Sequence, residues 1–262
     1  MDTDTLLRTG IFVGVLAALV ALETLFPRKA RVMPRLSRWI TNLSLGGFSL
    51  LAVRLMGPLT VAGAALAAEA SGFGLLKLLL LPGWAIAFIA LILLDLAIWA
   101  QHMAMHRWPL LWRLHQVHHA DRDLDVTSGL RFHPFEAAVS MVWKAGVVFL
   151  LGAPLAVALA YEIVLGSMAL FTHANLRLPL WLDRALRYVI VTPDMHRVHH
   201  SIVRTETDSN FGNALSIWDR IFRTYRDEPE GGQDGFILGL EDWQDERSAR
   251  LSMAARMPFL KQ

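Results

Sequence analysis

The stretch WAIAFIALILLDLAIWAQHMAMHRWPLLWRLHQVHH, residues 84–119, decides the fold. Its first half contains one charged residue, Asp95, and with the residues before it is long enough to cross a bilayer. Its second half carries two histidine motifs, His102-x3-His106 and His115-x2-His118-His119. Because residues three or four apart lie on one face of a helix, each motif can direct several imidazoles to one point. The stretch therefore predicts a membrane helix that leads directly into clustered imidazoles.

The composition of the whole chain agrees with a membrane protein. Of its 262 residues 54% are hydrophobic and 18% are charged, and the mean hydropathy is +0.40, too apolar for an ordinary soluble domain. The net charge is only +2 and the basic residues are scattered, so we expect no nucleic-acid partner. The absence of cysteine excludes disulfides, thiolate zinc sites and thiolate-ligated iron–sulfur clusters.

Working outward from residues 84–119, further apolar stretches predict an all-α integral membrane bundle. We expect a retained membrane helix at 6–26 rather than a signal peptide, because acids stand where a signal peptide has basic residues. A second apolar stretch, 40–68, has a predicted break at Gly57-Pro58. The third, 78–106, ends before Pro109. Two shorter stretches, 137–151 and 155–171, predict a hairpin that turns at Gly152-Ala153-Pro154.

The basic residues of the segment 28–38 predict the orientation. Five of them have no acid among them, which by the positive-inside rule places this loop in the cytoplasm; they are Arg28, Lys29, Arg31, Arg35 and Arg38. The hairpin then starts and ends on the same side, and every histidine cluster lies in a cytoplasmic cap. The chain has 21 arginines and four lysines, which favours a bacterial cytoplasmic membrane. We predict N-terminal membrane helices at 1–77, a metal-binding domain at 78–226, and a cytoplasmic C-terminal tail at 227–262 with a helix near 241–257.

The ten histidines, all between positions 102 and 200, predict a metal centre. Imidazole-only ligation suits zinc, copper, iron or nickel. A single tetrahedral zinc would leave half of the set unused. Two metals with about five ligands each would use all ten and leave one octahedral position on each for oxygen or substrate. The candidate ligands are His102, His106, His115, His118, His119, His173, His196, His199 and His200, with His133 as a further candidate.

These motifs, in this order and between membrane helices, resemble the fatty acid hydroxylase superfamily, also called the sterol desaturase family. The resemblance covers roughly residues 80–226. It includes Asp95-Leu-Ala-Ile-Trp, Arg131-Phe-His133-Pro, His173-Ala-Asn175, Asp208-Ser-Asn-Phe-Gly212 and Trp218-Asp219-Arg220. It implies a di-iron, O2-dependent membrane oxidoreductase that hydroxylates or desaturates a lipid drawn from the bilayer. Some members carry a further paired histidine where this chain has only His173, and His133 is the candidate for that role.

Four other polar residues invite specific expectations. Asp95 lies seven residues before His102 and either orients a ligand imidazole or pairs with an arginine. Asn210 is either near the metal through a water or a turn residue, and we favour the turn. Lys144 and Glu162 lie within the apolar hairpin and are expected to pair.

The electrons for such a reaction must come from elsewhere. The sequence has no dinucleotide-binding fingerprint, no haem-binding domain and no cysteine, so we expect a separate donor protein or a diffusible reductant. The alternative function is a zinc or copper binding or transport protein, which would place its histidines along a path through the bilayer. A membrane scaffold without metal is a third. The substrate stays open among sterols, fatty acyl chains, alkylglycerols, carotenoids and aminolipid head groups.

Overall fold

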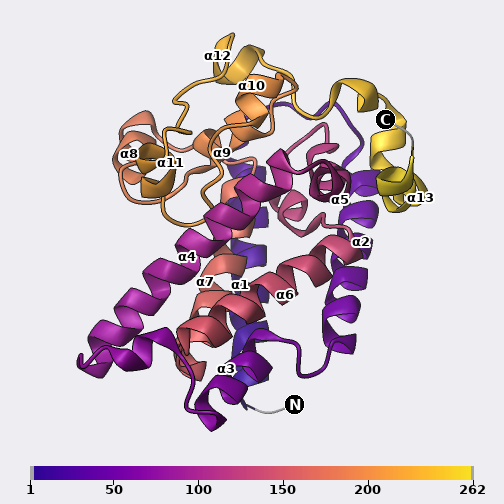
Figure 1. Cartoon of the computed structure of the whole chain (residues 1–262). Coiled ribbons are helices and arrows are strands. Elements are labelled where there is room, and N and C mark those ends of the chain that lie inside the picture. Colours follow the sequence, from indigo (N-terminus) through magenta and orange to yellow (C-terminus); the bar gives the residue numbers. More distant parts are fainter. Residues whose placement is uncertain (1–2, 261–262) are drawn as a thin grey trace.

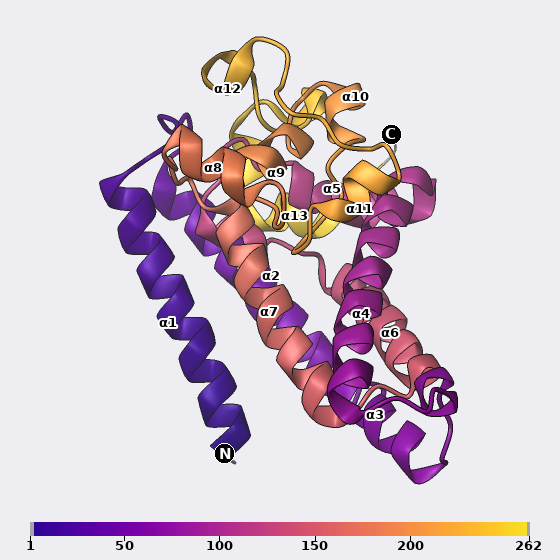
Figure 2. The same ribbon diagram turned by 90° about the vertical axis from the view of Figure 1, so that its left-hand side faces the viewer.

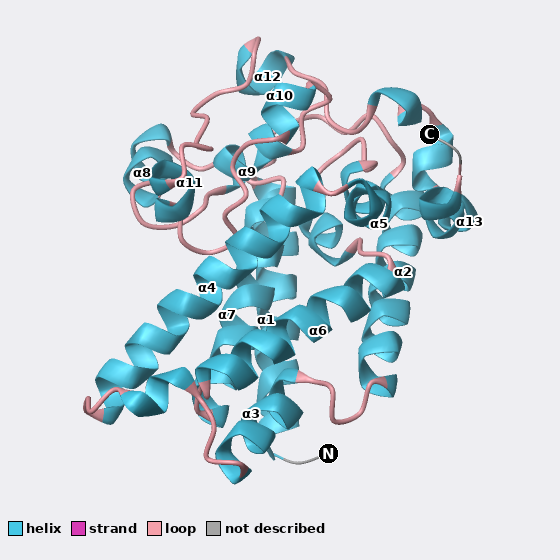
Figure 3. Cartoon of the chain, in the orientation of Figure 1, coloured by secondary structure: helices cyan, strands magenta, loops and turns pink. Residues whose placement is uncertain are grey.

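The computed structural model describes residues 3–260, and these form helices joined by turns and loops (Figure 1, Figure 3). Within 3–260 there is no strand, only three isolated bridges. Five segments are long and apolar enough to cross a membrane, which confirms the predicted all-α membrane fold; they are Leu6–Leu25, Val61–Leu78, Gly83–Arg107, Pro134–Leu151 and Leu155–His173.

The helices are of two kinds. The long ones are α1 (Thr3–Leu25), α2 (Arg35–Leu55), α4 (Gly83–Arg107), α6 (Pro134–Leu151) and α7 (Leu155–His173). The short ones are α3 (Val61–Ala70), α5 (Pro109–His119), α8 (Leu180–Leu186), α9 (Pro193–His199), α10 (Arg204–Thr207), α11 (Ile217–Ile221), α12 (Gly232–Gly235) and α13 (Leu251–Arg256). Five 3-10 turns complete the set: η1 (Leu75–Leu78), η2 (Val126–Leu130), η3 (Glu241–Trp243), η4 (Glu246–Ala249) and η5 (Met257–Phe259).

The long helices form a bundle, and most of the short elements form a cap on one end of it (Figures 1 and 2). Successive long helices run in alternating directions: α1 rises to the cap, α2 descends, α4 returns, and α6 and α7 form the predicted hairpin. The N-terminus and α3 lie at the end far from the cap. The chain therefore enters the cap at the ends of α1, α4 and α7, and the last two of these carry histidines near their ends.

The breaks in the apolar stretches occur where glycine and proline predict them. The stretch 40–68 is divided between α2 and α3, with Gly57 at a positive φ of 57° in the turn that separates them. The side chain of Thr60 then caps α3 by accepting a hydrogen bond from the backbone N–H of Gly63. Gly152 adopts the left-handed conformation that ends α6, with φ 64°.

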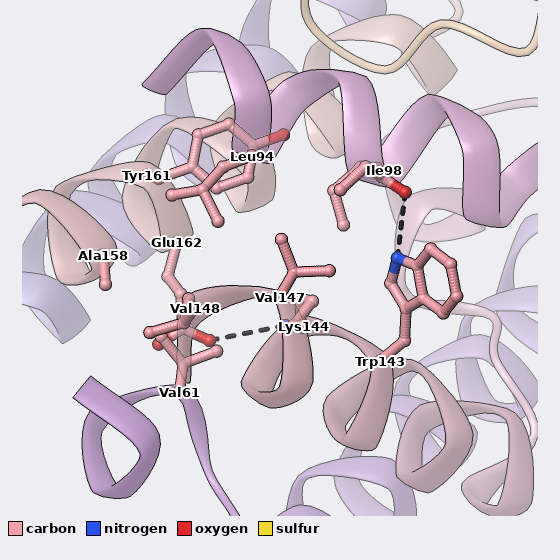
Figure 4. Close-up of a pocket in the computed structure, with 11 residues that line it drawn as sticks. Val61, Leu94, Ile98, Trp143, Lys144, Val147, Val148, Ala158, Tyr161 and Glu162 are labelled. Carbon is pink, nitrogen blue, oxygen red and sulfur yellow. Dashed lines mark hydrogen bonds and ion pairs between the residues drawn. The ribbon is translucent and has the colours of Figure 1, made fainter. Parts of the chain in front are cut away.

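The bundle core lies among α3, α4, α6 and α7, and a half-buried ionic group borders it (Figure 4). Lys144 Nζ lies 3.3 Å from Glu162 Oε1, which confirms the predicted pair. Glu162 also accepts a hydrogen bond of 2.9 Å from Arg8 on α1. The indole N–H of Trp143 donates to the Ala97 carbonyl across the α4–α6 contact.

The basic segment 28–38 is folded into the cap and is not a free loop. Arg38 is fully buried; its Nε and Nη2 donate to the Asp121 carboxylate at 2.7 and 2.8 Å, and its Nη1 donates to Asp125 at 2.6 Å. Arg28 pairs with Asp194 at 2.9 Å. The sequence analysis found no acid within the segment, because Asp121 and Asp194 lie more than 80 residues further along the chain than the arginines they pair with.

The C-terminal region is part of the cap, and the helix expected near 241–257 is confirmed only for its last part, α13. The chain forms η3, η4, α13 and η5 because Asp245 caps a new turn and Arg250 has an extended backbone, with φ −96° and ψ 121°. Ala254 and Met257 pack on Leu45 of α2. The side chain of Arg131 also donates to the Ser248 carbonyl at 2.6 Å. The predicted tail thus packs onto α2 and the segment after α5.

Candidate metal centre

Four elements deliver histidines to the junction of bundle and cap. His102 and His106 lie in the last two turns of α4, and His173 ends α7. The turns that follow are set by proline, because Pro109 opens α5 and Pro193 opens α9 at positions where a helix does not need the missing N–H. α5 carries His115, His118 and His119, and α9 with its C-cap carries His196, His199 and His200.

Nine of the ten histidines form two groups, within each of which one ligand atom per residue lies within 4.8 Å of the others. The five-histidine group comprises His102, His106, His115, His119 and His199. The four-histidine group comprises His118, His173, His196 and His200. All nine are buried except His102, which is half-buried. The two groups are the candidate sites for two metal ions.

Each His-His pair in the sequence is divided between the two groups. His118 belongs to the four-histidine group and His119 to the five-histidine group, and His200 and His199 are divided in the same way. Consecutive helical residues point about 100° apart, so one pair of neighbours can serve two sites. The rings of His119 and His200 stack with centroids 4.4 Å apart, which places the two groups side by side.

Within each group the Nε2 atoms point at one another. In the five-histidine group His102 Nε2 lies 3.1 Å from His115 Nε2 and 3.0 Å from His199 Nε2. In the four-histidine group His173 Nε2 lies 3.0 Å from His118 Nε2 and 3.1 Å from His196 Nε2. Converging lone pairs repel unless a cation or a proton lies among them. The donor set therefore fits a metal ion.

The spacing of the Nε2 atoms also bears on coordination number. Two nitrogens about 2.1 Å from a metal lie about 3.0 Å apart on neighbouring octahedral positions and about 3.4 Å apart on tetrahedral ones. The observed distances of 3.0–3.2 Å lie between these two values and are compatible with nitrogens that share one metal ion. A group of five imidazoles also exceeds what a tetrahedral ion can use.

The outer ring nitrogens of several histidines have hydrogen-bond acceptors. The Nδ1 atoms of His102, His199 and His173 lie 2.7–2.8 Å from the backbone carbonyls of Phe211, Ser209 and Ala169, respectively. His115 Nδ1 lies 2.6 Å from Glu136 Oε1. An N–H on Nδ1 that donates to such an acceptor leaves the lone pair on Nε2 free for a metal.

Other ring nitrogens are buried without a hydrogen-bond partner. These are Nδ1 of His118, His196 and His200 and both ring nitrogens of His106. Burial lowers the pKa of His118, His119, His196, His199 and His200 well below the usual value, so these rings are neutral at pH 7. Neutral imidazole is the form that binds metal.

We expect the metal-free protein to lose stability in mild acid. The five histidines with lowered pKa take up protons more readily in the unfolded chain, where the pKa is about 6.5, than in the folded one. Their contribution to the free energy of unfolding is fully present above about pH 6.5 and decreases as the pH falls below that value. Thermal unfolding of chelator-treated protein in detergent should show a Tm that is flat above neutrality and falls in acid. A Tm that rises between pH 6.5 and pH 5 would contradict this burial.

The tenth histidine, His133, lies outside both groups, so the structure does not bring it together with the other nine. Its Nδ1 accepts a hydrogen bond from the Phe135 N–H and so caps α6, and its Nε2 lies 3.3 Å from the Ala255 carbonyl. Pro134 starts that helix and turns the preceding ring toward the C-terminal segment instead of toward α5.

Asp95 has neither of the expected partners. Its carboxylate accepts hydrogen bonds from Tyr161 Oη, Trp218 Nε1 and Leu215 N at 2.8–3.1 Å. Seven helical residues correspond to about 10.5 Å of rise, too far for Asp95 to hold His102 directly. Asn210 has a left-handed backbone with φ 51°, as a turn residue often does, and its side-chain amide donates to two backbone carbonyls.

Glu136 is a site residue that the sequence analysis missed. It lies in the first turn of α6, is buried, and contacts His115 from 21 residues further along the chain. The available signal was an acid just after His133-Pro134, at the start of an apolar helix. That signal did not indicate which imidazole the acid contacts.

We expect Glu136→Gln to weaken metal binding at the five-histidine group. The amide carries no charge to support the His115 imidazole, and loss of such a partner typically costs 10–100-fold in metal affinity. The matched control is Glu162→Gln, because Glu162 is also an acid within the helical hairpin but pairs with Lys144 and Arg8. Metal retained against a chelator series measures the effect, and equal retention in both variants would contradict this role of Glu136.

A helical membrane bundle that gathers nine imidazoles, eight of them buried, into two adjacent groups defines a class of membrane protein with a candidate polyhistidine metal centre. The chain belongs to the fatty acid hydroxylase family, whose family model matches residues 87–224. The matched segment runs from within α4 to beyond α11 and includes all nine grouped histidines. This membership confirms the resemblance found in the sequence.

Several curated proteins are similar to just over half of the chain. The chain is 32% identical to an ornithine lipid hydroxylase of Rhizobium tropici over 56% of this chain and 44% of that protein. It is 27% identical to the human alkylglycerol monooxygenase over 56% of this chain and 31% of that enzyme. A very-long-chain aldehyde decarbonylase of rice is 25% identical over 55% of this chain and 24% of that protein. The chain thus matches less than half the length of each relative. No solved structure matches it.

Proposed function

We propose that this protein binds two iron ions and uses O2 and two external electrons to hydroxylate a C–H bond of a lipid. The observation that carries the proposal is the pair of adjacent, buried, all-imidazole groups at the membrane end of the cap. Two relatives are a lipid hydroxylase and an alkylglycerol monooxygenase, which supports a lipid substrate and an oxygenase reaction.

The two groups would hold one iron each. When bound, the irons supply the redox chemistry by which one atom of O2 enters the C–H bond and the other is reduced to water. The nine grouped histidines are the proposed ligands. Their burial excludes bulk water from the site, and the lowered pKa values of the five cap histidines keep those imidazoles unprotonated.

The substrate is proposed to enter from the bilayer between α4 and the α6–α7 hairpin. The cavity between these helices is lined mostly by apolar side chains, among them Leu94, Ile98 and Val147 (Figure 4). Such a lining suits an alkyl chain, but the cavity holds only about 10 Å³, so the proposed entry requires these helices to move apart. The proposed electron source is a separate donor protein or a diffusible reductant.

The test compares membranes that contain the wild-type protein with membranes that contain His199→Ala. Each is supplied with reductant and isotopically heavy O2, and the extracted lipids are examined by mass spectrometry. The proposal predicts a lipid that carries one labelled oxygen atom only in the wild-type sample. A new double bond without label would indicate desaturation, and no difference between the samples would contradict an oxygenase.

The alternative of zinc or copper transport makes a different structural demand. It requires histidines along a path through the bundle, whereas the nine grouped histidines lie at one end of it. In the described residues the polar side chains deeper in the bundle core include Lys144 and Glu162, which pair with each other. We therefore retain the oxygenase as the proposed function.

The cap is proposed to face the cytoplasm, and cysteine labelling tests this. The natural chain has no cysteine, so single substitutions report one position each. Glu246→Cys is in the cap, where the Glu246 side chain is 82% exposed, and Ser71→Cys follows α3 at the opposite end. We expect an impermeant thiol reagent on intact cells to label Ser71→Cys only. Labelling of Glu246→Cys from outside would reverse the orientation.

A further inference from the structure

The segment Ser209–Gly212 contacts two ligands of the five-histidine group through its backbone. The Ser209 carbonyl lies 2.7 Å from His199 Nδ1, and the Phe211 carbonyl lies 2.8 Å from His102 Nδ1. These two histidines face each other with their Nε2 atoms 3.0 Å apart. A shift of this segment would therefore turn both rings.

Asp219 holds this segment through backbone N–H groups. Its Oδ1 accepts hydrogen bonds from the backbone N–H of Phe211 at 2.9 Å, and its Oδ2 accepts from that of Gly212 at 2.8 Å. Oδ1 also accepts from Trp99 Nε1 and Thr224 Oγ1 at 3.0 and 2.7 Å. The carboxylate is fully buried, so four donors replace its water.

Two residues of the segment, Gly212 and Asn210, show how closely it is held. A Cβ on Gly212 would lie 2.9 Å from Asp219 Oδ2, so glycine is what lets the carboxylate approach. Asn210, between the two carbonyls, donates through Nδ2 to the Met195 and Arg226 carbonyls at 2.9 and 2.8 Å. Its Oδ1 accepts from the Arg226 N–H at 2.8 Å.

We propose that Asp219 and Asn210 are positioning residues for the five-histidine site: they fix the Ser209 and Phe211 carbonyls, which orient His199 and His102. The four-histidine group has no contact of this kind with the segment. The effect is therefore selective for one of the two metals. This inference rests on the proposed two-metal centre, and it assigns a role to the Asp208-Ser-Asn-Phe-Gly212 and Trp218-Asp219-Arg220 motifs.

The test uses Asp219→Asn. The substitution replaces one of the two carboxylate oxygens with an NH₂ group, which cannot accept a hydrogen bond from the backbone N–H of Phe211 or Gly212. The matched control is Asp95→Asn. Asp95 is also a buried acid, and it accepts hydrogen bonds from Leu215 N and Trp218 Nε1, which follow the segment in the chain. It has no hydrogen bond with Phe211 or Gly212. Metal-free proteins are reloaded with ferrous iron and challenged with a chelator series. We expect Asp219→Asn to release one of two irons at about 10–100-fold lower chelator strength, and Asp95→Asn to match the wild type.

A double variant identifies which site is affected. His173→Gln removes a ligand of the four-histidine group, so the remaining iron should reside in the five-histidine group. At the chelator strength that removes one iron from Asp219→Asn, the double variant His173→Gln with Asp219→Asn should be nearly free of iron, whereas His173→Gln with Asp95→Asn should keep one iron. If Asp219→Asn does not accumulate, Asn210→Gly tests the same step, because glycine tolerates the positive φ and removes only the side-chain bonds.

The outcomes separate the two proposals. Unchanged iron retention in Asp219→Asn, or equal weakening of both sites in it and in Asp95→Asn, would overturn the positioning role while leaving the two-metal centre intact. A wild-type protein that binds no iron would instead overturn the proposed function.

Discussion

His173→Gln is expected to contain about half the iron of the wild type and to have no measurable activity, whereas His133→Gln keeps near-normal iron and measurable activity. His173 Nε2 lies between those of His118 and His196, at 3.0 and 3.1 Å, in a group with only four imidazoles. Its loss leaves three, and an under-coordinated ion is released or inactive.

His133 supplies the matched comparison because it is also a buried histidine beside the cap. Its ring caps α6 and contacts the Ala255 carbonyl, so its replacement should cost about 0.5–2 kcal/mol of stability and no ligand. Iron per chain, measured side by side in the two variants, decides the matter. Equal loss in both would make His133 a tenth ligand, and full retention in His173→Gln would contradict the assignment of His173.

Arg38→Met is expected to destabilise the cap more than any surface substitution. Its guanidinium donates to both Asp121 and Asp125 and to the Asp123 carbonyl, with no exposure of the side chain. Removing one partner of a buried ion pair costs about 3–5 kcal/mol, because the acids stay buried without their counter-ion. Since Asp121 follows His119 by two residues, iron content should fall with stability.

Arg250→Met is the control for Arg38→Met. Arg250 is 62% exposed and lies 3.5 Å from Glu246, and an exposed pair of this kind contributes about 0–1 kcal/mol. The Tm in detergent and the fraction of monodisperse protein measure the difference. The account of the Arg38 network fails if both variants unfold at the wild-type temperature.

The fold could be predicted largely from local patterns. Long apolar stretches give the helices of the bundle, and Gly57-Pro58 and Gly152 mark turns because these residues interrupt helices wherever they occur. The ion pairs of the basic segment could not be predicted, because the acids that neutralise Arg38 come from a loop more than 80 residues away. The C-terminal turns depend on packing against α2, which no local pattern reveals.

The sequence identified the histidines of the candidate site but not how they divide into two groups. Spacings of three and four residues identified the histidines, since these spacings place rings on one helix face. That His118 and His119 serve different groups depends on where α9 and α7 deliver their own rings. Asp95 was assigned by helix face alone, although its distance along the helix already excluded direct contact with His102.

The most direct test of the central claim is the metal content of the wild-type protein purified without oxygen. The claim is that two adjacent imidazole groups each hold one iron. Elemental analysis is predicted to give two irons per chain, falling to about one in His173→Gln. One metal per chain that is unaffected by His173→Gln, zinc in place of iron, or no metal at all would contradict the account.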